Sequence, residues 1–258
     1  MDAKIGDFVV TPRNGKAVEI NSMWYNALKI MEELCSQFDS KEKAVKYKRL
    51  ADKCKKSFNE KFYNKRRKCL YDVLGDSKIR PNQLFALSLT YPVLDPSSEE
   101  AKEMFNTVTK KLLNNYGLKT LAKGEENYVE KYEGDSFRRD MSYHQGITWP
   151  LLLGIYYDAF KKIIDAEKGK KRKEELKLEF NNFVENVEKT FIQEFTKGKT
   201  VGGLCEIYDS VKPFEARGAY QQAWSIAEVF RIILENWKDR YAKYNWESWK
   251  RVKIWKIK

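Results

Sequence analysis

The chain has 258 residues, of which 42% are hydrophobic and 14% aromatic. This composition excludes an intrinsically disordered protein and supplies enough apolar side chains for a substantial core, so we expect one folded domain. Residues 1–20 lack the apolar segment of a secretory signal, and no apolar stretch reaches the length of about 18 residues that a bilayer requires. We therefore expect a soluble, cytoplasmic protein with no membrane partner.

The formal net charge is +12, from 49 Lys and Arg against 37 Asp and Glu. A basic surface attracts polyanions. The lysines are nevertheless interleaved with acidic residues on nearly every polar helix face, and only short runs such as residues 168–173 and 249–258 concentrate positive charge. Because no motif of a nucleic-acid reader accompanies the charge, we expect no nucleic acid as a partner.

The four cysteines, at positions 35, 54, 69 and 205, form no C-x-x-C pair, and His144 is the only histidine. This spacing lacks a zinc signature, so we expect reduced thiols and no metal. Cys35 and Cys54 fall within apolar helical periodicities, which favours buried free thiols over a redox role.

Apolar residues recur at three- and four-residue spacing along most of the chain, and alternating strand-like runs are nearly absent. This periodicity predicts an all-α fold with about seven principal helices. In chain order, the helices are expected at residues 18–38, 42–63, 82–90, 98–114, 149–166, 174–195 and 218–239. The first helix carries an apolar stripe on one side, at Met23, Ala27, Met31, Leu34 and Phe38.

Short and long connections alternate between these helices. The long ones, which hold most of the glycines, are residues 1–17, 64–80, 115–148 and 196–217. Such alternation is expected of helical hairpins whose long loops all emerge at one end, and loops gathered on a rigid scaffold usually form a site. Seven helices cannot all be paired in hairpins. We therefore expect the chain to start partway through the fold.

Several segments carry a resemblance to a known family. They are MDAK (1–4), TPRNGKAVEIN (11–21), WYNAL (24–28), IRPNQLFALS (79–88), YHQGITWP (143–150), GLCEI (203–207), RG (217–218) and QAWSIAEV (222–229). In this order they resemble the amylo-α-1,6-glucosidases, the glucosidase half of glycogen debranching enzymes. One departure is Glu215-Ala216-Arg217, where the family usually has a proline before the arginine.

The resemblance implies an α/α toroid of six helical hairpins with its site at the end where the long loops gather. It also implies removal of a single glucose from an α-1,6 branch of glycogen or another branched α-glucan, with inversion and without a cofactor. The family has Thr-Trp-Met-Asp where this chain begins with Met1-Asp2. Residues 1–258 are therefore expected to be the C-terminal part of one toroid domain, whose missing N-terminal portion is a candidate partner as a separate chain.

By the same resemblance Asp2 is the general acid and Glu206 the general base. An inverting pair lies about 6.5–9.5 Å apart, so that a water fits beside the base. Judged without the motif, Asp2 is an ordinary terminal residue and Glu206 a loop carboxylate. The remaining predicted substrate contacts are Arg13, Lys16, Glu19, Asn21, Tyr143, His144, Thr148 and Trp149.

Structural roles compete with several of these assignments. Glu19 fits a helix cap, the lone His144 fits a structural donor, and Trp149 fits a helix start. Trp24 and Trp224, at helical spacing beside small and aliphatic residues, are expected in the core. For the whole chain the alternatives are a glycosidase of the same fold that acts on a different α-glucoside, or an inactive truncated helical domain, and we expect the isolated chain to be a poor catalyst.

Overall fold

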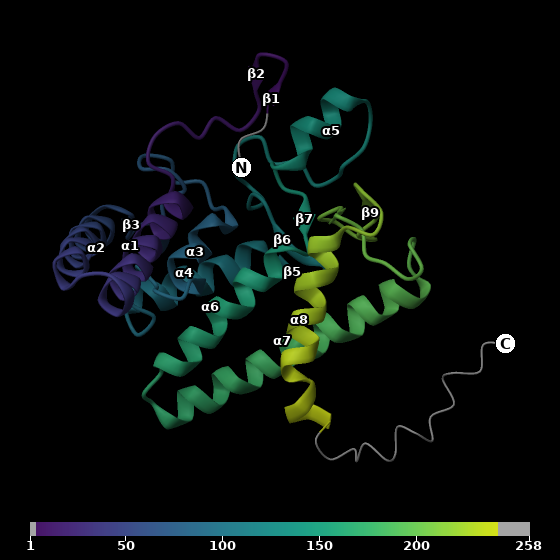
Figure 1. The fold of residues 1–258 in the computed structure, drawn as a ribbon. Helices are drawn as coiled ribbons and strands as arrows, with labels where there is room; N and C mark the ends of the chain where they lie inside the picture. Colours follow the sequence, from purple (N-terminus) through teal and green to yellow (C-terminus); the bar gives the residue numbers. More distant parts are fainter. Residues whose placement is uncertain (1–3, 242–258) are drawn as a thin grey trace.

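The computed structural model describes residues 4–241 (Figure 1). Eight α-helices and one 3₁₀ helix fall within this part of the chain. They are α1 (Val18–Phe38), α2 (Lys41–Lys61), η1 (Pro81–Leu84), α3 (Phe85–Ser88), α4 (Glu99–Leu112), α5 (Ser136–Tyr143), α6 (Leu152–Ala166), α7 (Lys170–Lys197) and α8 (Ala223–Tyr241). None of these helices is long and apolar enough to cross a membrane.

All seven helices expected from periodicity are present, so the all-α prediction is confirmed. The segment at 82–90 begins as η1 and continues as the single turn α3. The helix α5 was not expected, because it lies in the long segment 115–148 and only Ser142 of its eight residues is buried. Its start is set by Asp135, whose side chain accepts a hydrogen bond from the Arg138 amide.

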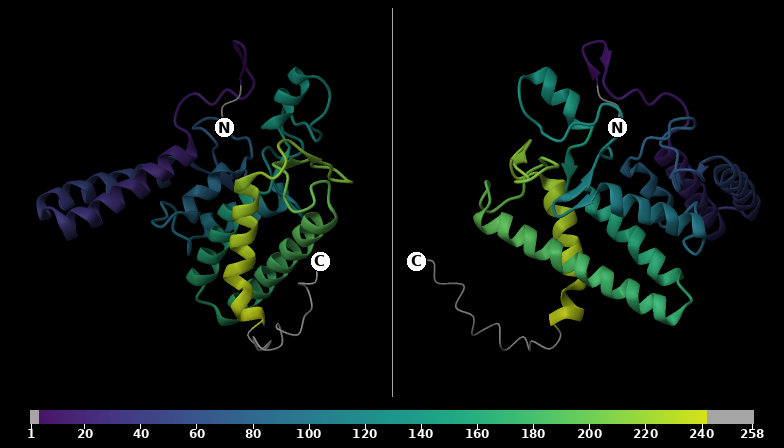
Figure 2. Two further views of the ribbon diagram at one scale, coloured as in Figure 1. Left: turned by 45° about the vertical axis from the view of Figure 1, so that its right-hand side comes forward. Right: turned by 180° about the vertical axis from the view of Figure 1, so that it is seen from behind.

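The hairpin of α1 and α2 projects from the rest of the molecule (Figure 2, left). Its short turn is capped by Ser40, whose hydroxyl accepts the Lys43 amide at 3.2 Å. The two helices pack against each other, with Lys55 of α2 over the Tyr25 ring of α1, and Tyr25, Leu28 and Phe58 are all buried.

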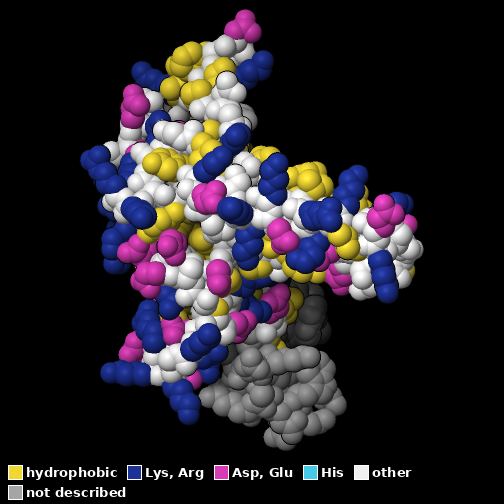
Figure 3. Space-filling view, turned by 90° about the vertical axis from the view of Figure 1, so that its left-hand side faces the viewer, with side chains coloured by type: hydrophobic (Ala, Val, Ile, Leu, Met, Phe, Trp, Pro, Cys, Tyr) yellow, Lys and Arg dark blue, Asp and Glu magenta, His cyan; other side chains and the backbone are white. Residues whose placement is uncertain are grey.

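The predicted apolar stripe of α1 faces away from this core. Trp24 is 57% exposed and Phe38 is 80% exposed, so the expectation that Trp24 is a core residue is wrong. The exposed side also carries Ile20, Met31 and Leu34. Figure 3 shows hydrophobic side chains on the face that bears the hairpin, interleaved with lysines and carboxylates, as the charge pattern predicts.

The core centres on α6, which contacts α3, α4, α7 and α8 (Figures 1 and 2). Tyr156, Tyr157, Phe160 and Ile163 on α6 are all buried. Tyr156 stacks on Phe105 of α4 and Tyr157 packs on Phe180 of α7 in a tilted arrangement, so α6 joins the hairpins on either side of it. The cysteine at 35 is buried as expected, Cys54 is only half-buried, and all four thiols are free.

A five-stranded antiparallel sheet of very short strands joins the loops. Its order is β5 (Leu113–Asn114), β6 (Gly117–Lys119), β7 (Thr148–Trp149), β8 (Ile207–Tyr208) and β9 (Ala216–Arg217). Two further hairpins are β1 (Lys4–Ile5) with β2 (Phe8–Val9), and β3 (Tyr63–Asn64) with β4 (Cys69–Leu70). Strands of two or three residues leave no alternating signal in the sequence, which is why they escaped prediction.

Candidate active site

The four long loops predicted to gather at one end do contact one another. Arg13 in the first loop reaches Asp72 in the second at 2.7 Å. The third loop joins the first through Gln145, whose amide donates to the Val10 carbonyl at 3.0 Å. The third and fourth meet where the Tyr132 amide donates to Asp209 at 2.8 Å. The loops therefore form one continuous layer over the helices.

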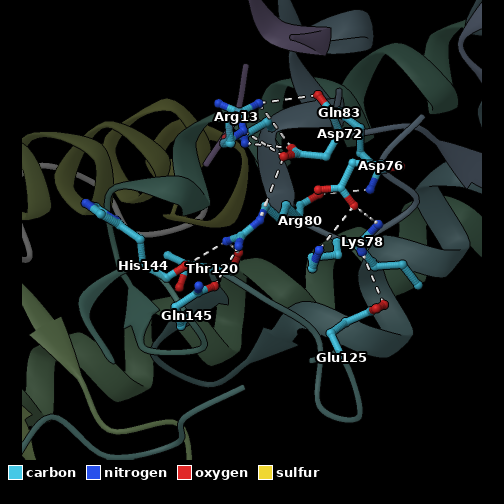
Figure 4. A network of polar contacts seen from close by, with 12 residues as sticks. Arg13, Asp72, Asp76, Lys78, Arg80, Gln83, Thr120, Glu125, His144 and Gln145 are labelled. Carbon is cyan, nitrogen blue, oxygen red and sulfur yellow. Dashed lines mark hydrogen bonds and ion pairs between the residues drawn. The ribbon is translucent and has the colours of Figure 1, made fainter. Parts of the chain in front are cut away.

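Arg13 is the centre of a buried ion-pair network at the start of α1 (Figure 4). Its guanidinium donates to both carboxylate oxygens of Glu19, at 2.5 and 2.7 Å, and to Asp72. Burial alone would raise the pKa of Glu19, but the bonds and charge of Arg13 outweigh it and hold that pKa below its ordinary value. Glu19 is therefore a partner of Arg13.

Arg80 continues this network into the third loop (Figure 4). Its guanidinium donates to the His144 carbonyl at 2.6 Å and to the Gln145 side chain at 2.6 Å. Asp72 lies between Arg13 and Arg80 and also accepts from Asn82 at 2.9 Å. The charges of two arginines and two carboxylates balance, so the network fixes the loops without leaving a free charge.

Glu206 immediately precedes β8 and is 9% exposed. One carboxylate oxygen accepts the Tyr143 hydroxyl at 2.5 Å and the Gln222 amide at 3.4 Å. The other accepts the backbone amide of Ala219 at 3.1 Å. The third and fourth loops and the approach to α8 thus hold both oxygens in place.

Gly218 allows this close packing around Glu206. A Cβ atom at Gly218 would lie 2.5 Å from the Glu206 carboxylate and 2.9 Å from the Ile207 side chain. Its φ of +72° also lies in the region that favours glycine. Among the glycines between α7 and α8, Gly218 is therefore the one that packs against the carboxylate.

Glu206 differs from the other buried carboxylates in the kind of partner it has. Of the four buried acidic residues in the described part of the chain, Glu19 and Asp72 pair with arginines of the network, and Asp209 pairs with Arg217 at 3.0 Å. The Glu206 carboxylate accepts hydrogen bonds from neutral donors and forms no ion pair with any described residue. A carboxylate held by neutral groups keeps its negative charge available to take a proton from water.

Aromatic rings lie against the Glu206 loop. Tyr143 packs on Trp149 with centroids 4.8 Å apart, and His144 stacks on Trp149 at 5.4 Å. Trp224 extends the cluster at 6.0 Å from Trp149 and remains 42% exposed, so its assignment to the core is wrong. Burial, aided by the positive charge of Arg80, lowers the pKa of His144 to about 4, which makes the imidazole neutral near pH 7.

The other residues predicted to contact the sugar do not join the cluster beside Glu206. Lys16 and Asn21 line a separate cleft of about 270 Å³ against α2, together with Trp24. Thr148 is fully buried in β7, where its hydroxyl contacts Asn114 and Ser210, so it does not line a sugar pocket in this structure. Asp2 lies outside the described residues, and its role as the acid stays a prediction.

Sequence reasoning missed Asp72, Arg80 and Asp209 as organisers of these loops. Arg80 lies in the segment IRPNQLFALS (79–88), and Asp209 follows β8 directly. Arg217, preceded here by alanine, lies in β9 and donates to Asp209 at 3.0 Å. The departure from the family pattern at residue 216 therefore leaves the arginine in an ion pair.

Solved structures with a similar fold include a protein described as a sialidase, at 14% identity and a TM-score of 0.66 over 88% of this chain and 20% of that one. A glycosidase in complex with glucose matches at 12% identity and a TM-score of 0.57 over 87% of this chain and 53% of that one. A GH63 mannosylglycerate hydrolase from Thermus thermophilus in complex with glucose matches at 11% identity and a TM-score of 0.54, over 85% and 47%. The chain thus spans about a fifth of the first structure and about half of the other two.

Helical hairpins with loops gathered over one end define the fold as that of the α/α-toroid glycosidases, and the partial toroid predicted from sequence is confirmed. None of the curated proteins matches the sequence of this chain. The family model described as Amylo-alpha-1,6-glucosidase matches residues 1–231, and the chain belongs to this glycoside hydrolase family.

Proposed function

We propose that this chain contributes the base-bearing part of a glucosidase that removes α-1,6-linked glucose at trimmed branch points of glycogen or another branched α-glucan. The proposal rests on one observation above the others. Glu206 is buried among neutral donors, while the other buried carboxylates of the described residues are neutralised by arginines. In the proposed reaction Glu206 activates a water, and Asp2 protonates the leaving oxygen.

The aromatic cluster beside Glu206 supports a sugar as the substrate. Trp224 is 42% exposed and offers an apolar face to a sugar ring, with the buried Trp149 packed behind it, while a neutral His144 is able to bond hydroxyls. The exposed apolar stripe of α1 supports the further proposal that a companion polypeptide covers this helix in the active assembly.

Replacement of Glu206 by glutamine in the active assembly tests its assignment as the general base. Loss of a general base lowers the rate of glucose release by roughly 10²–10⁴-fold, with little change in the unfolding temperature. Glu215→Gln is the matched control, because Glu215 lies in the same loop but is exposed and pairs with Lys199 on the surface. A near-normal rate in the Glu206 variant rejects the assignment.

Stereochemistry provides an independent test of the mechanism. If Glu206 acts through water, the first product released from an α-1,6 linkage is β-glucose. Proton NMR of the initial product distinguishes the anomers before they interconvert, and α-glucose would refute the inverting mechanism. Glu206→Ala with added azide should release β-glucosyl azide, because the small anion takes the place of the activated water.

A different glucoside is the second candidate, since a protein of this fold is described as a mannosylglycerate hydrolase. The fold alone does not select the substrate. Comparison of a branched limit dextrin with maltose and trehalose separates the two candidates. Preference for either disaccharide would favour the second.

A further inference from the structure

A second cleft is lined by residues of α4, α6 and α7 and includes none of the hydrogen-bond partners of Glu206. Figure 2, right, shows how these three helices are arranged. The volume of the cleft is about 700 Å³, within the range of roughly 300–1,000 Å³ typical of ligand pockets. The residues along its α4 side run from Glu99 to Asn115, and the 14 residues of α4 at about 1.5 Å each make a cleft on the order of 20 Å long. This shape suits a chain of several units rather than a single small molecule.

Amide side chains from three segments converge on the cleft. Asn106 comes from α4, Asn115 from the turn between β5 and β6, and Asn182 and Asn186 from successive turns of α7. Asn186 donates to Asn115 at 3.4 Å, whereas the side chains of Asn106 and Asn182 have no hydrogen-bond partner among residues 4–241. Each amide offers donors and an acceptor, which matches a ligand rich in hydroxyl groups.

The floor of the cleft is aromatic. Phe183 is half-buried at its edge and packs on Tyr156 with centroids 5.0 Å apart. Phe105 and Phe160 lie beneath and are buried. An apolar ring beside free amides is the combination that a sugar requires, because sugar rings present both C–H faces and hydroxyl edges.

The charges in the cleft disfavour an anionic ligand. The two cationic residues that line it are both paired: Lys102 with Glu167 at 3.1 Å, and Arg172 with Glu175 and Glu179 at 3.1 Å each. A phosphate or a nucleic acid would find no unpaired cation among these lining residues.

We propose that this cleft is a second carbohydrate-binding site, which holds a neutral α-glucan chain apart from the site of hydrolysis. The choice of α-glucan among neutral sugars rests on the proposed function, and the existence of the sugar site rests on the cleft alone. None of the residues that line it hydrogen-bonds to Glu206. One end lies at Asn114 in β5, so a bound polymer would be held near the sheet that carries the Glu206 loop, which raises its local concentration there.

The test compares the full chain with the double variant Asn106→Ala/Asn182→Ala. Both positions lie on exposed helix surface, where alanine is a better helix former, so the variant should fold. Loss of two neutral hydrogen-bonding groups is expected to weaken binding of maltoheptaose by roughly tenfold in calorimetry and to reduce retardation in a glycogen-containing native gel. Asn181→Ala is the matched control, because Asn181 is the exposed neighbour of Asn182 and does not line the cleft.

Three outcomes would overturn the proposal. The first is unchanged maltoheptaose binding in the double variant, and the second is an equal loss in the Asn181 control. The third is a changed sedimentation coefficient of the double variant without glucan, which would make the cleft a protein interface. Glu206→Gln separates this proposal from the proposed function: it should abolish glucose release and leave binding in the cleft intact, whereas failure of the Glu206 assignment would leave the calorimetric result unaffected.

Discussion

The hydroxyl of Tyr143 donates to the Glu206 carboxylate at 2.5 Å across 63 residues of sequence. Burial and this bond raise the pKa of Tyr143, so the hydroxyl stays protonated and remains a donor. Tyr143, expected from sequence to contact the sugar, is in the structure a partner of the proposed base. Its ring also packs on Trp149, which links the carboxylate to the aromatic cluster.

Tyr143→Phe keeps the ring and removes this donor. A hydrogen bond to a charged group is worth about 1.5–3 kcal/mol, so kcat should fall roughly 10- to 100-fold. KM for a small glucoside should change much less, since the hydroxyl binds the base rather than the sugar. Steady-state kinetics check this, and a rise in KM with kcat unchanged would instead assign Tyr143 to substrate binding.

Gly218→Ala should displace Glu206. The new Cβ would meet the carboxylate at 2.5 Å, and small shifts of a catalytic group can lower the rate on the order of 10²-fold. Gly202→Ala is the matched control, because Gly202 also has a positive φ of +83° but has no atom within 4 Å of the added Cβ. Both variants should lose stability by about 1–3 kcal/mol, while only the first loses most of its activity. Equal activities would contradict the packing argument.

Asp72→Asn should unfold the loop layer. Its carboxylate lies between Arg13 and Arg80, whose side chains are 3% exposed, and loss of one partner from a buried ion pair costs about 3–5 kcal/mol. Urea denaturation followed by circular dichroism measures the change. Asp39→Asn, which breaks only the exposed pair with Lys43, should alter stability by less than about 1 kcal/mol.

Stability should decrease as the pH falls from about 6.5 towards 4, because of His144. Its pKa is about 4 in the fold against an ordinary value of 6.5, so in this window the unfolded chain binds a proton that the folded chain does not. His144→Gln should remove this part of the pH dependence. Since His144 is the only histidine, one imidazole resonance reports its titration by NMR. A midpoint near 6.5 in the folded protein would disprove the prediction.

The isolated chain should self-associate through α1. Trp24, Leu34 and Phe38 form part of an exposed apolar stripe, and large apolar patches drive association. Trp24→Lys/Leu34→Lys should shift sedimentation velocity profiles towards monomer at micromolar concentration. Leu178→Lys on α7 removes a single leucine that is 62% exposed and should have little effect. A monomeric unmodified chain would contradict this prediction.

The positions of the helices could be predicted from sequence because they depend on local periodicity. The expected bounds of α1 agree with Val18–Phe38, and the short turn after it is capped by Ser40 as its sequence allows. The short strands and α5 escaped prediction, because two-residue pairing and a mostly exposed helix leave no periodic signal.

Which face of α1 is buried was decided only by the tertiary structure. Both sides of the helix carry apolar residues, and the sequence stripe through Met31 and Phe38 proved to be the exposed one. The buried side carries Tyr25 and Leu28, and α1 packs on α2 and α3. Helical periodicity identifies faces, but the neighbour that a face meets is set by chain connections and packing.

For the candidate site, the motif pointed to Glu206 and to the aromatic residues at 143–149. The sequence did not indicate that Tyr143 and Gly218 would both contact Glu206, or that Asp72 would join Arg13 to Arg80. These contacts join residues far apart in the chain, whose pairing depends on how the loops cross at the end of the helices. Local sequence therefore determined the helices and the candidate base, whereas the long-range packing of loops determined its partners.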